Sequence, residues 1–508
     1  MIRIITIFTF IFLQLGCGGE SESNNPETDT EFVPFDIGDG FDSLRNMANT
    51  ELSISGAPAV SIAIYKDGEI VFAEAYGEKT RGQNEKVDED TLFQMGSTTK
   101  IFTVLAILRM LEDNSLTVDA TLMDLLPGIE VADDKRSDWE DINLHHLLSH
   151  QSGLMDFIDW AGEANSLQEF ARTTFPTNYG QMNPPGIFWN YSNPGWSYLG
   201  AVLETQSGQV FSQIMEEDVF LPLDMTRTTI EKPFVVADGN YALGAGTISR
   251  TGINVVGSAS HIDEIHDGIF GEPAGTYTWS TPTEMLKMAD FLINGNTALL
   301  SDELRNEMTT PHADLQVTTP ADYGYGLFLS DGFRDGFGDG SVWYPIKLWS
   351  HAGNTLAYSS MYWVLPEQNV AVSILSSGRE TDFRATMMEA LETVITLPAP
   401  EEIPEKPVAT ELFNDHVGRY QGSWGIADVT TNGSQLFQSI PTFDDQGRFY
   451  KPELEAIGGS MFLSNVDGIN NTITFIPLIE GGESFYIRNR TFVGTRIDEA
   501  TTPEKPKQ

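Results

Sequence analysis

The chain of 508 residues is long enough for two or three domains, and its hydrophobic content of 41% is ordinary for a protein with a packed core. No interior segment reaches the roughly 18 to 20 apolar residues that span a bilayer. The net charge of -44 would repel nucleic-acid phosphates, which argues against nucleic acid as a partner and indicates a well-solvated acidic surface.

The N-terminus, residues 1–17, is typical of a signal peptide. The apolar run IITIFTFIFLQL is too short to span a membrane and ends at Gly16-Cys17. A small residue before a cysteine resembles a bacterial lipoprotein signal, although Gln14 stands where that pattern prefers leucine. The alternative is an ordinary secretory signal with a chance cysteine. Either signal predicts export to the bacterial cell envelope, and the first also predicts a lipid anchor on Cys17. With one cysteine, no disulfide can form within the chain.

The acidic residues 18–40 predict a flexible tether, and residues 41–397 predict a domain with strands at both ends and mostly helices between them. One sheet built from the two ends, with a helical region inserted in the middle, fits this order. The predicted elements are a hairpin turning at 66–68, a buried helix at 101–113, a capped helix at 280–295, a hairpin turning at 366–369 and a helix at 382–397.

The C-terminal part differs in composition. Residues 398–411 are rich in proline and glutamate and predict a linker. Residues 412–498 hold short alternating runs split by glycine and asparagine, without a convincing helix, and predict a small antiparallel β-domain, barrel-like or sandwich-like. Residues 499–508 predict a disordered tail.

A short polar run, GSTTK, opens the buried helix and contains Ser97 and Lys100. At this spacing the two side chains share a helix face. Backbone N–H groups at a helix N-terminus favour negative charge, which suits an oxyanion forming near Ser97. Burial favours the neutral amine of a lysine, which could then take the proton of the serine. The ordinary alternative is that Ser97 only caps the helix.

Two further motifs contain residues that could take part in catalysis. Tyr191-x-Asn193 lies between Gly/Pro turns and predicts an exposed functional loop, in which the phenol could relay a proton. His351-x-Gly353 precedes a strand; Gly353 would let a substrate backbone lie close, and His351 could donate to a substrate carboxylate or carbonyl. Taken singly, an aromatic residue filling a loop and a plain loop histidine are the common alternatives.

In this order and at wide separation, Ser-x-x-Lys, Tyr-x-Asn and His-x-Gly resemble the serine β-lactamase and penicillin-binding protein superfamily. The pattern is most similar to the class C-like branch, which includes D-alanyl-D-alanine carboxypeptidases, D-aminopeptidases and esterases. The stretches INLHHLLSHQSGL and YGYGLFL also look like family segments, and the resemblance covers residues 45–395. It implies an α/β (α+β) fold: an antiparallel sheet flanked by helices with a helical subdomain. The VGRY and FVGTR stretches resemble the small C-terminal all-β barrel that often trails this family.

The resemblance also implies roles for individual residues. Ser97 would be the acylated nucleophile, Lys100 its general base, and Tyr191 the group that passes a proton to the leaving group. Asn193 would hold Lys100 and the substrate amide. The backbone N–H groups of Ser97 and Asn354 would form the oxyanion hole.

His351 stands where many β-lactamases have a lysine, and a histidine is only fractionally charged near neutrality. We therefore expect weak β-lactam hydrolysis. The resemblance implies a serine hydrolase that acts through an acyl-enzyme on D-amino-acid peptides, amides or esters, with no cofactor and a small molecule or peptide as substrate. The alternative is a penicillin-binding sensor that is acylated at Ser97 without turnover. Oligomeric state stays open, as does whether the last domain closes one rim of the cleft or binds cell-wall polymer.

Rival active sites have less support in the sequence. No Gly-x-Ser-x-Gly occurs, which excludes the nucleophile elbow of α/β-hydrolases. His146 and His150 lie one helical turn apart and could form a metal pair, but no His-Glu-x-x-His accompanies them, so we predict no metal site. Residues 260–267, SHIDEIHD, lack metal-ligand spacing and predict a solvated loop.

Overall fold

The structure is a computed structural model, and it describes residues 40–132, 136–156, 164–244, 274–336, 340–355, 357–479 and 481–497. Cys17, the signal peptide, all but the last residue of the tether, the 260–267 segment and the C-terminal tail lie outside these ranges. None of the helices within the described ranges is long and apolar enough to cross a membrane.

The centre of the larger domain is an eight-stranded antiparallel sheet in the order β2-β1-β12-β11-β10-β7-β6-β5. Its strands are β1 Ala59–Lys66, β2 Glu69–Gly77, β5 Ala313–Asp314, β6 Asp322–Tyr323, β7 Phe328–Ser330, β10 Leu348–Asn354, β11 Ser359–Leu365 and β12 Val370–Ser376. The first strand pairs with the last along its length, from Val60 opposite Ser376 to Lys66 opposite Val370. The prediction of one sheet built from both ends of the domain is therefore confirmed.

Both predicted hairpins of this sheet are present. The first turns at Asp67 and Gly68, whose φ angles of 52° and 95° are the two positive values that a type I′ turn requires. The second turns at Pro366–Gln368 and Asn369, where φ is 51°. Asparagine and glycine tolerate this left-handed region, which explains why these residues mark the turns.

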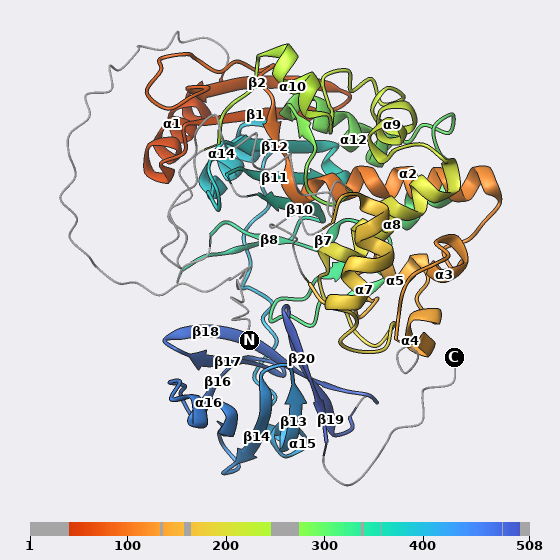
Figure 1. The fold of residues 1–508 in the computed structure, drawn as a ribbon. Helices are drawn as coiled ribbons and strands as arrows, with labels where there is room; N and C mark the ends of the chain where they lie inside the picture. Colours follow the sequence, from red (N-terminus) through yellow and green to blue (C-terminus); the bar gives the residue numbers. More distant parts are fainter. Residues whose placement is uncertain are drawn as a thin grey trace.

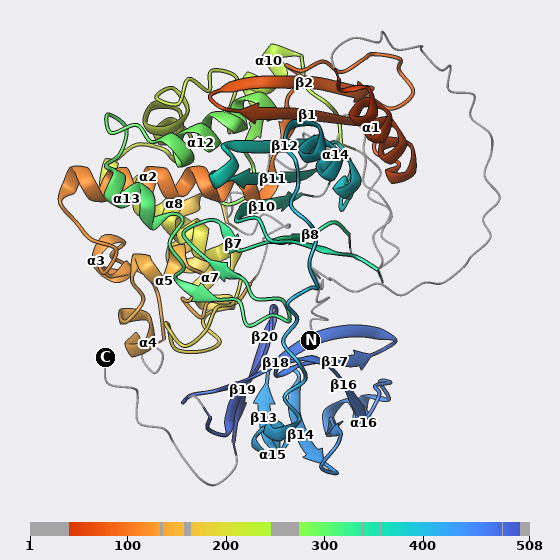
Figure 2. The same ribbon diagram turned by 180° about the vertical axis from the view of Figure 1, so that it is seen from behind.

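Helices cover both faces of the sheet (Figures 1 and 2). On one face lie α1 Asp42–Ser55 and α14 Arg384–Val394, and on the other α2 Thr99–Asn114 and α12 Pro282–Asn294. Strand β1 contributes to the core on both faces of the sheet, because successive side chains of a strand point to opposite faces. Val60, Ile62 and Ile64 join the cluster beneath α1 and α14, whereas Ala63 and Tyr65 join the larger cluster that contains α2.

The helical region between β2 and α12 forms a lobe beside the sheet (Figure 1). Its described helices are α3 Leu122–Leu125, α4 Arg136–Glu140, α5 Leu144–Leu148, α6 Leu167–Glu169, α7 Phe175–Asn178, α8 Asn193–Ser207, α9 Phe211–Met215 and α10 Lys232–Asp238, with π-helical turns at Phe170–Thr174 and Glu216–Phe220. Helix α13 Asp302–Glu307 follows α12. Two small ribbons complete the domain, β3 Phe93–Gln94 with β4 Trp279–Ser280, and β8 Phe333–Arg334 with β9 Trp343–Tyr344.

The C-terminal β-domain is a closed eight-stranded barrel, β13 to β20, which lies below the larger domain in Figure 1. Its strands are β13 Gly418–Gly422, β14 Gly425–Thr431, β15 Leu436–Ser439, β16 Glu453–Gly458, β17 Met461–Val466, β18 Ile469–Pro477, β19 Ser484–Asn489 and β20 Phe492–Arg496. The first and last strands pair through Tyr420 and Arg496, and this pairing closes the barrel.

The expectation that the C-terminal β-domain lacks helices is wrong in two places. Helix α15 spans Phe413–His416 and packs Phe413 into the barrel core, and α16 spans Pro441–Gln446. Helix α16 has proline at its start and Gly447 at φ 66° after its end, a pattern that favours a short helix but is easily taken for a turn.

Candidate active site

Ser97 lies in a single 3-10 turn, Gly96–Thr98, that leads directly into α2. The N-cap of α2 is Thr98, and its side chain makes no capping hydrogen bond. The alternative that Ser97 serves as the helix cap is therefore wrong, because Ser97 stands one residue earlier. Its hydroxyl instead faces Lys100, whose Nζ lies 3.3 Å from Ser97 Oγ.

The amine of Lys100 is fully buried, and three oxygens lie within hydrogen-bond distance of it. Nζ donates to Asn193 Oδ1 at 2.8 Å and to the Gly275 carbonyl at 2.9 Å, and Ser97 Oγ is its third neighbour. Because the amide and carbonyl oxygens only accept, they take two N–H groups of the amine. The 3.3 Å from Nζ to Ser97 Oγ places the amine within reach of the serine hydroxyl, as a general base requires.

Strand β10 packs directly against the Ser97 turn, and two glycines make this contact possible. A methyl group at Gly353 would lie 2.0 Å from the Met95 carbonyl oxygen and 2.8 Å from Ser97 N. One at Gly96, where φ is 56°, would lie 2.7 Å from Asn354 N. A Cβ at Gly353 would face the serine turn, so a glycine is needed here for the close packing of β10 against that turn. Its contact with a substrate backbone stays a prediction.

The Ser360 hydroxyl of β11 fastens the same turn to the sheet. It donates to the Met95 carbonyl at 2.7 Å and lies 2.7 Å from Thr98 Oγ1. The Asn354 side chain points elsewhere, since its Oδ1 accepts from Ser359 Oγ and from Glu380 N. Only the backbone of Asn354 therefore borders the Ser97 turn, and its oxyanion role stays a prediction.

Tyr191 and Asn193 lie at the start of α8, which Ser192 caps by accepting from Gly195 N at 3.3 Å. The expectation of an exposed loop is wrong: Tyr191 is 5% and Asn193 4% exposed. The phenol ring stacks on His150 with ring centroids 4.1 Å apart, and Lys100 Nζ lies 5.0 Å from its centroid. The structure therefore brings Tyr191 beside the Ser97–Lys100 pair.

Two residues that sequence reasoning missed complete the polar network. Asp156 Oδ1 accepts from the backbone and side-chain N–H groups of Asn193 at 2.9 and 3.1 Å. These contacts fix the amide so that its oxygen faces Lys100. Arg490, on the C-terminal barrel, donates from Nε to Asp156 Oδ2 at 2.6 Å. No local pattern marks either residue, because their partners are distant in sequence.

His351 lies on β10 near this network and is 2% exposed. Burial lowers its pKa to about 3, and the positive charges of Lys100 and Arg490 act in the same direction. Its Nδ1 donates to the Ala352 carbonyl at 2.7 Å, which leaves Nε2 as an acceptor 3.5 Å from Tyr323 OH. The imidazole is thus neutral at physiological pH, and a substrate-binding role for it stays a prediction.

The histidine pair weighed as an alternative metal site does not form. Helix α5 ends at Leu148, so His146 and His150 do not share its face. His146 Nδ1 accepts from Asn143 N in a capping box, while both ring nitrogens of His150 face N–H donors, of Ser192 and Trp196. Among the residues that the structure describes, no group of three or more potential ligands could hold a metal ion.

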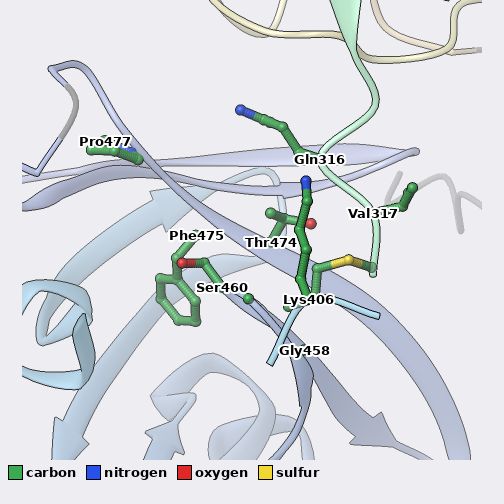
Figure 3. A pocket seen from close by; sticks show the side chains of 10 residues that line it. Gln316, Val317, Lys406, Gly458, Ser460, Thr474, Phe475 and Pro477 are labelled. Carbon is green, nitrogen blue, oxygen red and sulfur yellow. The ribbon is translucent and has the colours of Figure 1, made fainter. Parts of the chain in front are cut away.

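A separate cavity lies between the barrel and the loop after β5. Figure 3 shows its lining, which includes Gln316, Lys406 and Thr474. Its volume of about 180 Å³ is below the roughly 300 to 1,000 Å³ usual for small-molecule sites. None of the candidate catalytic residues borders it.

The comparisons with known proteins give the family and the fold of the chain. The family model described as Beta-lactamase matches residues 45–395. Penicillin-binding protein 4* of Bacillus subtilis (strain 168) is 23% identical over 400 residues, which cover 73% of this chain and 82% of that protein. Esterase EstB of Burkholderia gladioli is 29% identical over 203 residues, or 36% of this chain and 49% of the esterase. The solved structure of SurE with D-Leu has a TM-score of 0.65 at 20% identity and covers 90% of this chain and 99% of that one, which shows the shared fold.

Proposed function

Because this chain belongs to the β-lactamase family, we propose that it is a serine hydrolase that works through an acyl-enzyme on Ser97. The observation that carries the proposal is the buried Lys100 amine, held by Asn193 and Gly275 with its third neighbour at the Ser97 hydroxyl.

In the proposed reaction, the neutral amine of Lys100 takes the hydroxyl proton of Ser97 while Oγ attacks the substrate carbonyl. The N–H groups of Ser97 and Asn354 stabilise the oxyanion of the tetrahedral intermediate. As the intermediate collapses, the C–N or C–O bond to the leaving group breaks, and Tyr191 gives its proton to the leaving amine or alcohol and takes the one that Lys100 holds. The acyl group stays on Ser97 as an ester, and Lys100 is again neutral. Water then attacks this ester, the carboxylic acid leaves and the serine regains its proton.

The proposed substrate class follows from the neutral state of His351. A buried imidazole with a pKa of about 3 offers no permanent cation to the carboxylate of a β-lactam. We therefore propose short esters and D-amino-acid peptides or amides as better substrates than β-lactams. The similarity to an esterase and to a fold neighbour solved with D-Leu supports this choice.

The proposed place of action is the bacterial cell envelope. The support is the apolar run that ends at Gly16-Cys17, followed by an acidic segment fit to hold the hydrolase away from a membrane. Incorporation of labelled palmitate into the wild type but not into Cys17→Ala would establish the lipid anchor. Equal incorporation into both would contradict it.

Acylation of Ser97 is tested with labelled fluorophosphonate and fluorescent penicillin on the mature protein. The wild type should take the label and Ser97→Ala should not; equal labelling of both would contradict the nucleophile assignment. A panel of p-nitrophenyl esters, nitrocefin and D-Ala-D-Ala peptides then measures turnover. Label that stays bound for hours with no hydrolysed product would instead support the penicillin-binding sensor.

A further inference from the structure

The hairpin between β19 and β20 carries a barrel residue into the active site. Arg490 and Thr491 form its two-residue turn, and Asn489 Oδ1 accepts from the Thr491 N–H and hydroxyl at 3.0 and 2.9 Å. Across the domain boundary, the Asn190 side chain donates to the Arg490 carbonyl at 3.2 Å. The hairpin tip is thus held by its own strand and by the segment just before Tyr191.

An apolar cluster and a buried arginine fasten the rest of this boundary. Phe188 packs against Tyr486 with ring centroids 5.4 Å apart, in a cluster that also contains barrel residues Ile476 and Val493. Arg488 donates to the Trp189 carbonyl at 2.7 Å and to the carbonyl of Leu315 at 3.1 Å. Because these contacts immobilise the hairpin against the larger domain, the position of Arg490 is fixed as well.

The Arg490 side chain contacts two residues of the candidate site. Its Nε donates to Asp156 Oδ2 at 2.6 Å, and its Cζ lies 4.4 Å from the centre of the Tyr191 ring. The side chain of Asp156 is only 7% exposed, and that of Arg490 20%. A carboxylate so little exposed needs a partner for its charge, and a guanidinium supplies that charge at every physiological pH.

The network continues from Asp156 to the nucleophile. The other carboxylate oxygen holds both N–H groups of Asn193, and the amide oxygen of Asn193 accepts from Lys100 at 2.8 Å. Without Arg490, the Asp156 carboxylate would lose the partner of its Oδ2 and turn toward water. This change would loosen Asn193, which orients the Lys100 amine.

We infer that Arg490 is a positioning residue of the active site: it fixes Asp156, and through Asp156 and Asn193 it orients the Lys100 amine toward Ser97. The C-terminal barrel then completes the catalytic arrangement of the larger domain. This inference rests on the proposed function, since it assumes that Lys100 activates Ser97.

The test measures acylation of the full mature chain by fluorescent penicillin, or by labelled fluorophosphonate where penicillin does not react. For Arg490→Gln, we expect the maximal acylation rate to fall about 10- to 100-fold, with the half-saturating concentration within about threefold of wild type. Arg490→Lys keeps the charge and should recover part of the rate. Asp156→Asn should lower the rate similarly, and the double variant should be no slower than the slower single variant.

Arg419→Gln is the matched control. Arg419 lies on the same barrel, at the end of β20 away from Arg490, where its carbonyl accepts from Ile497 N. Its exposed side chain donates from Nε to Asp428 at 2.6 Å. The Arg419→Gln protein should be acylated at the wild-type rate. An equal loss in Arg419→Gln would assign the effect to barrel stability and overturn the inference.

Three further outcomes separate the inference from the proposed function. Wild-type acylation by Arg490→Gln would overturn the positioning role. A higher half-saturating concentration at an unchanged maximal rate would also overturn it, because Arg490 would then act by contacting the substrate. Ser97→Ala is measured alongside: if it still takes the label, the proposed function itself fails, whatever the Arg490 variants show.

Discussion

The contact between Gly353 and the Ser97 turn can be tested by adding one methyl group. In Gly353→Ala, the new Cβ would lie 2.0 Å from the Met95 carbonyl oxygen, whereas real Cβ contacts are not shorter than about 3.0 Å. Strand β10 must therefore move away from the turn by at least about 1 Å. A displacement of this size in an active site lowers rates by on the order of 100-fold, and overpacking costs roughly 1 to 3 kcal/mol of stability.

The assay for Gly353→Ala is the acylation rate with fluorescent penicillin or a p-nitrophenyl ester, together with the thermal midpoint. Gly195→Ala is the control, because its added methyl group would meet its nearest neighbour at 3.7 Å, an ordinary contact. It should keep wild-type activity and stability. Wild-type acylation by Gly353→Ala would refute the argument, since the strand could then shift without disturbing Ser97.

Three other substitutions test the site and the barrel. Lys100→Ala should lower the acylation rate of Ser97 by about 10²- to 10⁴-fold, the usual range for a lost general base, while circular dichroism stays unchanged; fast acylation would exclude the base role. His351→Lys should lower the thermal midpoint without raising nitrocefin hydrolysis, because an ammonium group is costly to bury at a position that is only 2% exposed; a strong nitrocefin rate would contradict this. Burial lowers the pKa of His416 to about 4, so its neutral form adds stability that is complete above pH ~6.5 and is lost as the pH falls toward 4. His416→Phe should therefore remove up to about 3 kcal/mol of this acid sensitivity, measured by urea unfolding at pH 4.5 and pH 7; an unchanged pH dependence would contradict the assignment.

The features that could be predicted from the sequence are those with a local signature. Alternating side chains and turn residues such as Asp67-Gly68 located the hairpins, since strand period and positive φ act over a few residues. The spacing of Ser97 and Lys100 placed both on one face, because three residues nearly complete a helical turn. The two short helices of the barrel were not predicted, because neither has a periodic pattern. One is held by the packing of Phe413 and the other by the residues at its two ends.

Predictions about environment failed where burial depends on distant segments. Tyr191 was expected to be exposed because prolines and glycines surround it, yet His150 and Arg490 cover its ring. His351 was expected to be partly charged, yet burial keeps it neutral. In both cases the residue type was informative, but its exposure was decided by chain segments that only the fold brings near.

The Asp156–Arg490 pair shows why the residues that hold a catalytic group in place are hard to predict from one sequence. The two residues are 334 positions apart, and each lies in a stretch with no unusual composition. Asp156 is needed because of Asn193. The amide oxygen of Asn193 accepts from Lys100, and the N–H groups of the same amide need an acceptor of their own. A carboxylate meets that need but cannot stay buried alone, and the barrel supplies the cation. Once Lys100 is placed as a base, the Asn193 amide therefore needs an acceptor, and the carboxylate that fills this role needs a cation. Only the fold shows that the cation comes from the C-terminal barrel.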